Sequence, residues 1–77
     1  MDDDPPIVLG TALKHGVDAN DAQHAWAFAI DLFILSEGML MFIGPDRAGN
    51  LLEVGVVEWH GGPAIVHAMA VRPKFQR

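Results

Sequence analysis

Apolar runs of strand length alternate with turn-forming residues through the second half of the chain. The two clearest runs are residues 51–59 and 64–71, and the glycines and proline in the four residues between them predict a tight connection. Two shorter runs, residues 32–35 and 39–43, precede them, with Gly38 in the first turn, where a positive φ is needed. The pattern therefore predicts a four-stranded antiparallel meander.

The residues before these runs have the spacing of an amphipathic helix. The apolar positions at i, i+3, i+4 and i+7 are Ala22, Ala25, Trp26 and Ala29. A helix over residues 19–29 is predicted, with Asp18 as its cap, and a short helix over residues 11–15 should end at Gly16. One or two N-terminal helices followed by consecutive strands predict an α+β fold, with the helices packed on one face of the four-stranded antiparallel sheet.

Alternation along the strands predicts which side chains face the helices. The aliphatic set expected on that side is Leu52, Val54 and Val56. Glu53 and Gly55 then point to the opposite, open face of the sheet. His67 and Met69 of the last strand should lie beside them. This open face is where a ligand would bind.

Length and composition are those of one small domain. The 77 residues are 51% apolar, which is enough for a compact core, and they include no cysteine, which excludes disulfides, zinc–thiolate sites and thiol catalysis. Residues 1–6 are acidic and carry two prolines, so a mobile tail is expected before a single domain over residues 7–77. The start does not resemble a signal peptide, and Asp31 and Glu37 interrupt the apolar stretch 25–44, so a cytoplasmic protein with no membrane span is predicted.

The net charge of −5 is unusual for a nucleic-acid binder, but its distribution is uneven. Residues 2–4 supply three of the acids, and the chain from Pro5 onward has a net charge of −2. The cations within the last six residues are Arg72, Lys74 and Arg77. Positive charge concentrated at the end of an apolar hairpin suits a polyanion, and the alternative is a solvated tail.

Four histidines, at positions 15, 24, 60 and 67, are the main candidates for chemistry. Their spacing fits no metal-binding motif, so neither a metal nor another cofactor is predicted. His24 and His60 are expected to be solvated, on a helix face and in a turn. His67 interrupts an apolar strand, and two interpretations stay open: a structural histidine bonded to a carboxylate such as Glu53, or a general acid or base.

Three stretches of the chain resemble one family of bacterial toxins. They are the Lys-His-Gly-Val sequence at residues 14–17, residues 43–54, and the ending over residues 67–75, with His-Ala-Met followed by Arg-Pro-Lys-Phe. Over residues 11–77 the chain is similar to BrnT-like type II toxins of the RelE superfamily, in particular to uncharacterised toxin-like proteins encoded beside small antitoxins. The resemblance implies a RelE-like α+β fold, metal-independent endoribonuclease activity on mRNA, and inhibition by a cognate antitoxin.

The resemblance also implies candidate site residues. His15 matches the family's histidine, whereas Met69 stands where the family often carries an arginine. The phosphate-binding role then falls to Arg72 and Lys74, whose guanidinium and ammonium groups suit an anion. His67, with His15 as the alternative, would move the protons during RNA cleavage.

The leading hypothesis is therefore a cytoplasmic toxin that cleaves mRNA, free or on the ribosome, and binds a protein antitoxin. The alternative is a non-catalytic interaction module, a decayed toxin that acts through its antitoxin or as a homodimer. The apolar residues Met39, Met41 and Ile43, expected outside the core, favour this alternative. A small-ligand-binding domain is a third class, which no glycine-rich phosphate loop supports.

Overall fold

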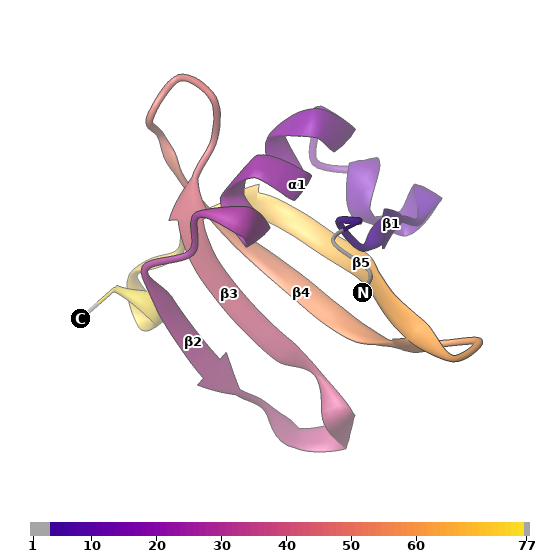
Figure 1. Cartoon of the computed structure of the whole chain (residues 1–77). Helices are drawn as coiled ribbons and strands as arrows, with labels where there is room; N and C mark the ends of the chain where they lie inside the picture. Colours follow the sequence, from indigo (N-terminus) through magenta and orange to yellow (C-terminus); the bar gives the residue numbers. More distant parts are fainter. Residues whose placement is uncertain (1–3, 77) are drawn as a thin grey trace.

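A long antiparallel hairpin forms the centre of the sheet in the computed structural model, which describes residues 4–76 (Figure 1). Its strands are β4, Leu51–Trp59, and β5, Gly62–Ala70. Between them His60 and Gly61 have φ angles of +48° and +88°. Glycine adopts this left-handed conformation without strain, which favours a turn at this point of the sequence.

Three shorter strands complete a five-stranded sheet. β3, Leu40–Pro45, pairs with β4, and β2, Asp31–Ile34, pairs with β3, both antiparallel, with the 3₁₀ turn η2, Ser36–Gly38, between β2 and β3. β1, Ile7–Val8, pairs with β5 in parallel, so the strand order is β1-β5-β4-β3-β2. The predicted antiparallel meander is confirmed for β2 to β5, but four strands is wrong for the whole sheet. Two residues are too few to show an alternating pattern, so β1 leaves no signal in the sequence.

The helix α1, Ala19–Ala27, packs mainly on β3 and β4. Asp18 caps it as predicted, because its Oδ1 accepts the N–H of Asn20 at 2.7 Å. The helix ends before the predicted residue 29, since the N–H of Ile30 already bonds to the carbonyl of Ile43 in β3 at 2.7 Å. The architecture is therefore α+β, with one α-helix on a five-stranded mixed sheet.

Between residue 4 and α1 the described chain contains a 3₁₀ turn and no second α-helix. The helix expected over residues 11–15 is the turn η1, Gly10–Leu13, and Gly16 follows it with a φ of +83°. Of the expected tail over residues 1–6, residues 1–3 lie outside the described part of the chain. Pro6 is buried, and its carbonyl accepts a hydrogen bond from Gln23 of α1 at 3.1 Å. Among residues 4–76 no helix is long and apolar enough to cross a membrane.

Small residues let α1 lie close to the sheet. Ala22 and Ala25 are fully buried, and a Cβ added to Gly44 of β3 would stand 2.1 Å from the carbonyl oxygen of Ala25. The buried side chains that the sheet contributes to this core are Leu52, Val54, Val56, Ile65 and Ala68. The prediction that the aliphatic set of β4 faces the helix is therefore confirmed.

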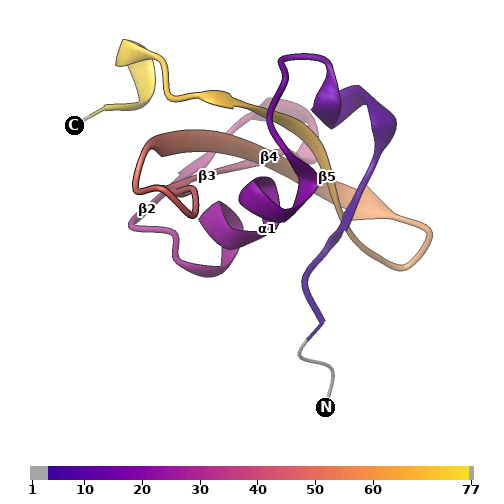
Figure 2. The same cartoon turned by 90° about the horizontal axis from the view of Figure 1, so that it is seen from above.

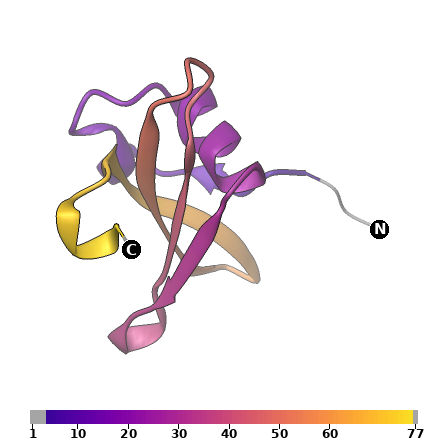
Figure 3. The ribbon, with the colours of Figure 1, turned by 90° about the vertical axis from the view of Figure 1, so that its left-hand side faces the viewer.

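The end of the chain covers part of the opposite face of the sheet. After β5 the chain forms the 3₁₀ turn η3, Pro73–Phe75, on the side of the sheet away from α1 (Figures 2 and 3). Phe75 is buried there against Met41 and Ile43 of β3, with Met39 packed beside them. The prediction that this apolar set lies outside any core is wrong, because Phe75 and its neighbours form a second core over it.

Candidate functional site

A carboxylate with no exposed surface lies on the open face of the sheet. Glu53 of β4 is 0% exposed. Its Oε2 is 2.7 Å from Nε2 of His67 and accepts a hydrogen bond from Nη2 of Arg72 at 2.6 Å. Its Oε1 accepts the main-chain N–H of Arg72 at 2.9 Å and the Nε–H of the same residue at 3.1 Å. Burial of a carboxylate requires such partners, so Glu53 fastens both residues to β4.

Glu53 stays ionised in this environment. Burial raises its pKa, but hydrogen bonds from the side chain of Arg72, from its main chain and from the side chain of His67 outweigh that effect, and the pKa lies below its ordinary value. The same contact raises the pKa of Arg72, chiefly through the side-chain hydrogen bond to Glu53. The two groups therefore form a fixed pair of opposite charges.

A β-bulge sets the direction of His67. Gly55 pairs with His67 and Val56 pairs with Ile65, so Val66 is an extra residue without a partner across the ladder. Ile65 therefore joins the core beneath α1 while His67 points to the open face. Plain alternation would place both on one face, and the bulge is the reason that it does not hold here.

Gly55 provides the space in which the side chain of His67 packs. The predicted neighbours are confirmed, because His67 lies opposite Gly55 in the ladder. Met69 likewise lies opposite Glu53. A Cβ added to Gly55 would stand 3.1 Å from Cβ of His67 and 3.0 Å from Sδ of Met39. The missing side chain thus lets the histidine and the methionine converge above this position.

One ring nitrogen of His67 is engaged and the other is free. The hydrogen bond between Nε2 and Glu53 confirms the carboxylate partner predicted for this histidine. Nδ1 has no hydrogen-bond partner within residues 4–76, yet it is not buried, and the side chain is 20% exposed. Because an ionised carboxylate can only accept, the network assigns the proton to Nε2. In the neutral tautomer with this proton on Nε2, the lone pair of Nδ1 faces solvent, as a general base requires.

His15 lies beside His67. The two ring centroids are 5.8 Å apart, and the ring planes are inclined at 74°. Thr11 helps to place this loop, because its hydroxyl donates to the carbonyl oxygen of Val66 at 3.1 Å and ties η1 to the bulge of β5. The structure thus brings together the two histidines that the sequence singled out. We refer to His15, Glu53, His67 and Arg72 as the Glu53 cluster.

Arg72 and Lys74 flank the ring of Phe75. The guanidinium carbon of Arg72 lies 5.6 Å from the ring centroid, and Nζ of Lys74 lies 5.3 Å from it. The side chain of Arg72 is 42% exposed, and within residues 4–76 its Nη1 makes no hydrogen bond. One edge of the guanidinium therefore holds Glu53 while the other is available to an anion. Arg77 lies outside the described residues.

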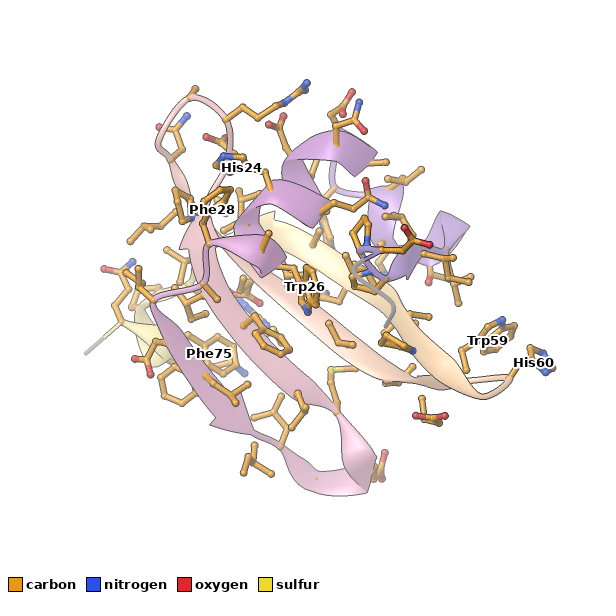
Figure 4. The ribbon with its side chains drawn as sticks, in the orientation of Figure 1. His24, Trp26, Phe28, Trp59, His60 and Phe75 are labelled. Carbon is orange, nitrogen blue, oxygen red and sulfur yellow. The ribbon has the colours of Figure 1, made fainter. Side chains whose placement is uncertain are left out.

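The other two histidines lie on α1 and in the β4–β5 turn (Figure 4). His24 is half-buried, which corrects the prediction of a solvated residue: its Nδ1 is 2.8 Å from the carbonyl oxygen of Pro45, and its ring packs on Phe28. His60 is exposed in the β4–β5 turn, edge-on to Trp59 with 4.6 Å between ring centroids. The rings of Trp59 and His60 line a hollow of about 490 Å³ together with residues 4–7 and 61–63. No residue of the Glu53 cluster borders this hollow.

Glu53 is the site residue that sequence reasoning left out, since it was named only as a hydrogen-bond partner. Its signal was a carboxylate flanked by apolar residues inside a strand, at a position that alternation places beside a lone histidine. Among residues 4–76 no three histidine, aspartate or glutamate side chains are placed to hold a metal ion. The cluster therefore consists of two histidines, one buried carboxylate and one arginine.

This composition defines a class of chemistry. A carboxylate that orients a histidine, with a second histidine and cations nearby, is an arrangement for moving protons on an anionic substrate. Comparison with known proteins finds no matching family model, no matching curated protein and no matching solved structure.

Proposed function

We propose that the protein is a BrnT-like toxin with a RelE-like fold, a metal-independent endoribonuclease that cleaves mRNA and is inhibited by a cognate antitoxin. The observation that carries the proposal is the free Nδ1 of His67, on a ring oriented by Glu53 and 5.8 Å from the ring of His15. A base, an acid and a cation at one place are what RNA needs for cleavage by its own 2′-hydroxyl group. The α+β architecture is compatible with this class.

His67 is the general base in this mechanism. Its Nδ1 takes the proton of a ribose 2′-hydroxyl, and the 2′-oxygen attacks the adjacent phosphorus. The bond between phosphorus and the 5′-oxygen breaks as protonated His15 donates its proton to that oxygen. The products are a 2′,3′-cyclic phosphate and a free 5′-hydroxyl. Because the attacking and leaving oxygens stand on opposite sides of the phosphorus, two separate histidines suit the reaction better than one.

Cations beside the histidines stabilise the charge that develops on the phosphate. The free edge of Arg72 offers planar hydrogen-bond donors, and Lys74 offers a mobile point charge. The arrangement of charge supports this role. Within residues 4–76, Arg47 is held by Asp21 at 2.8 Å, whereas Lys14 precedes His15 in the sequence and Lys74 lies two residues after Arg72. Positive charge is thus concentrated at one place in an acidic protein.

The test is RNA cleavage by the whole protein, in bacteria and after purification. New 5′ ends are mapped after induced expression, and the purified protein is assayed on RNA with a chelator present. We expect His67→Ala and His15→Ala each to lower the cleavage rate by about 10²–10⁴-fold, the usual worth of a general acid or base. His60→Ala, in an exposed turn, is the matched control and should cleave like the native protein. Arg72 is left intact, because its removal would strip a buried carboxylate of its main partner.

Two outcomes would overturn the assignment. Native-rate cleavage by a folded His67→Ala variant would remove His67 from the mechanism. Intact RNA in the presence of well-folded native protein would remove the ribonuclease function altogether.

The second candidate is a non-catalytic interaction module. The observation that favours it is the group of exposed apolar side chains Phe28, Ile30, Leu32 and Ile34. The salt dependence of RNA binding separates the two functions. A protein that neutralises several phosphates loses RNA affinity steeply as salt rises, whereas a module that binds only protein has no such affinity to lose.

A further inference from the structure

Two histidines from distant parts of the chain meet in the Glu53 cluster. Among residues 4–76, which include all four histidines, only the rings of His15 and His67 contact one another. His15 follows η1, which packs on β5, and His67 belongs to β5 itself (Figure 2). Sequence spacing cannot reveal a pair that the fold creates. Two imidazoles that can move protons are also two ligands for a transition metal ion.

Both rings have nitrogen atoms available to a metal ion. Nδ1 of His67 makes no hydrogen bond within residues 4–76 and is not buried. His15 is exposed, and in the same part of the chain neither of its ring nitrogens has a hydrogen-bond partner. Neutral imidazole binds zinc through such a free lone pair, so the pair offers two zinc ligands.

The separation of the two rings fits one shared ion. Zinc lies about 2.0–2.1 Å from a ligating imidazole nitrogen, so two imidazoles on one tetrahedral ion have ring centroids about 5–6 Å apart. The centroids of His15 and His67 are 5.8 Å apart. Because His15 is exposed, its ring can turn a lone pair toward the ion without disturbing the core.

Glu53 gives His67 the support that a zinc-binding histidine ordinarily has. Oε2 of Glu53 is 2.7 Å from Nε2 of His67, the ring nitrogen that would not bind the ion. Metal-binding histidines almost always donate this second N–H to a carboxylate, a main-chain carbonyl or water, which fixes the ring and makes the free nitrogen a better ligand. Glu53 is held in turn by the main chain and the guanidinium of Arg72. The free Nδ1 is therefore oriented before any ion arrives.

The surroundings of the pair limit the affinity without preventing binding. The charge of Arg72 is matched by Glu53, which it contacts at 2.6 Å. Lys14 and Lys74 are exposed and have long, flexible side chains, so their charges can move away from a bound ion. Structural zinc sites have four protein ligands, whereas this pair has two and leaves the other positions to water. Such binding is reversible, which suits a regulatory ion.

We propose that His15 and His67 form an inhibitory zinc site, in which one ion joins a ring nitrogen of His15 to Nδ1 of His67. The ion occupies the lone pair with which His67 would take the ribose proton. It also keeps His15 from carrying the proton that this residue would donate. Zinc binding does not depend on the ribonuclease function, but inhibition rests on that proposed function.

A zinc titration of the whole ¹⁵N-labelled protein at neutral pH tests the site, with NMR signals of the ring nitrogens as the readout. We expect Nδ1 of His67 and one nitrogen of His15 to shift together until one ion is bound per chain. Mg²⁺, which prefers oxygen ligands, should shift neither.

Variants locate the site. His15→Ala removes an exposed ligand and should weaken zinc binding by at least about tenfold, since loss of even an outer-shell partner costs about 10–100-fold. His67→Gln should bind as weakly, although its amide can still donate a hydrogen bond to Glu53. His60→Ala is the matched control and should bind zinc like the native protein. Native affinity in a folded His15→Ala variant, or shifts confined to His24 and His60, would overturn the site.

Inhibition is measured on the native protein and on His60→Ala, which keep both proposed catalytic histidines. Zinc at the concentration that saturates the NMR shifts should stop RNA cleavage, a chelator should restore it, and Mg²⁺ should have no effect. Cleavage at the native rate under saturating zinc would overturn the inhibition. Zinc binding at the pair by a protein that cleaves no RNA would support the site and overturn the ribonuclease function.

Discussion

Glu53 and His67 are fourteen residues apart in the sequence, and their Oε2 and Nε2 atoms are 2.7 Å apart on neighbouring strands. The same carboxylate binds the main chain and the guanidinium of Arg72, where the segment covering the open face begins. Glu53 therefore orients the proposed base and anchors part of the fold at the same time. Substitutions around it can separate these two effects.

Glu53→Gln should lower the free energy of unfolding by about 3 kcal/mol. The amide keeps the shape of the side chain but leaves the guanidinium of Arg72 without an anion, and it directs an NH₂ group at donors of Arg72 and His67. Urea unfolding measures the change. Asp21→Asn, which breaks the exposed pair with Arg47, is the control and should have a much smaller effect. Equal losses in the two variants would mean that burial adds nothing to the Glu53 network.

Acid should destabilise the protein through Glu53. The folded-state pKa of this carboxyl is lowered, so its contribution to stability is complete above the unfolded-state pKa and is lost as pH falls through the folded-state pKa. Asp21 acts in the same direction, because the side-chain hydrogen bond from Arg47 lowers its pKa. Urea midpoints measured from about pH 7 down to about pH 2 should therefore fall, and less steeply in Glu53→Gln. If the urea midpoints of the native protein and of Glu53→Gln fall equally with pH, protonation of Glu53 does not cause the loss of stability in acid.

Gly55→Ala should disturb the position of His67 more than it disturbs the fold. The new Cβ would stand 3.1 Å from Cβ of His67 and 3.0 Å from Sδ of Met39, so both side chains must move, at a cost of about 1–3 kcal/mol. The measurements are the ring signals of His67 by NMR and the rate of RNA cleavage. Gly62→Ala is the control, since a Cβ there meets nothing within 4 Å. Unchanged ring signals in Gly55→Ala would mean that the glycine does not position the histidine.

Gly44→Ala should be more damaging than Gly55→Ala, with a loss of about 3 kcal/mol or more. The added Cβ would stand 2.1 Å from the main-chain oxygen of Ala25, and a main chain cannot rotate out of the way as a side chain can. Helix α1 must then move off β3. Urea unfolding followed by circular dichroism measures both the stability and the helix content. A loss no larger than that of Gly55→Ala would show that α1 shifts freely on the sheet.

Phe75→Ala should cost about 3–5 kcal/mol, because it removes the buried ring of the second core and leaves a cavity over Met41 and Ile43. It should also increase binding of a fluorescent hydrophobic dye, since those side chains become accessible. Gln76→Ala, at the exposed neighbouring position, is the control and should change neither measurement. If Phe75→Ala unfolds like the native protein, the C-terminal segment is not part of the stable fold.

Much of the sheet could be predicted because alternation is clear in a long strand with one covered face. β4 and β5 are such strands, and their alternation alone predicts that Glu53 and His67 are neighbours on the open face. The pattern fails where no period exists or where its phase changes. β1 is too short to show a period. The bulge at Val66 places Ile65 in the core beneath α1, whereas alternation with His67 predicts the open face.

The cover over the open face could not be predicted from the sequence. Arg72 and Phe75 follow the last strand in a run with two other cations, which has the composition of a solvated tail. Alternation tells which side chains share a face, but it does not tell which distant segment packs on that face. Only the fold brings the main chain of Arg72 to Glu53 and the ring of Phe75 to Met41.

Val66 is one residue more than the β4–β5 ladder needs, and a strand can gain or lose such a residue without losing its pairing. A strand without it would keep every remaining pair in register, so the sheet and its buried carboxylate could persist. Its carbonyl, however, is the acceptor that holds Thr11 and the loop leading to His15. A relative lacking this single position would keep the same sheet, but the loop would no longer hold His15 beside His67. The gain or loss of one strand residue is therefore a route by which such a site could arise or decay.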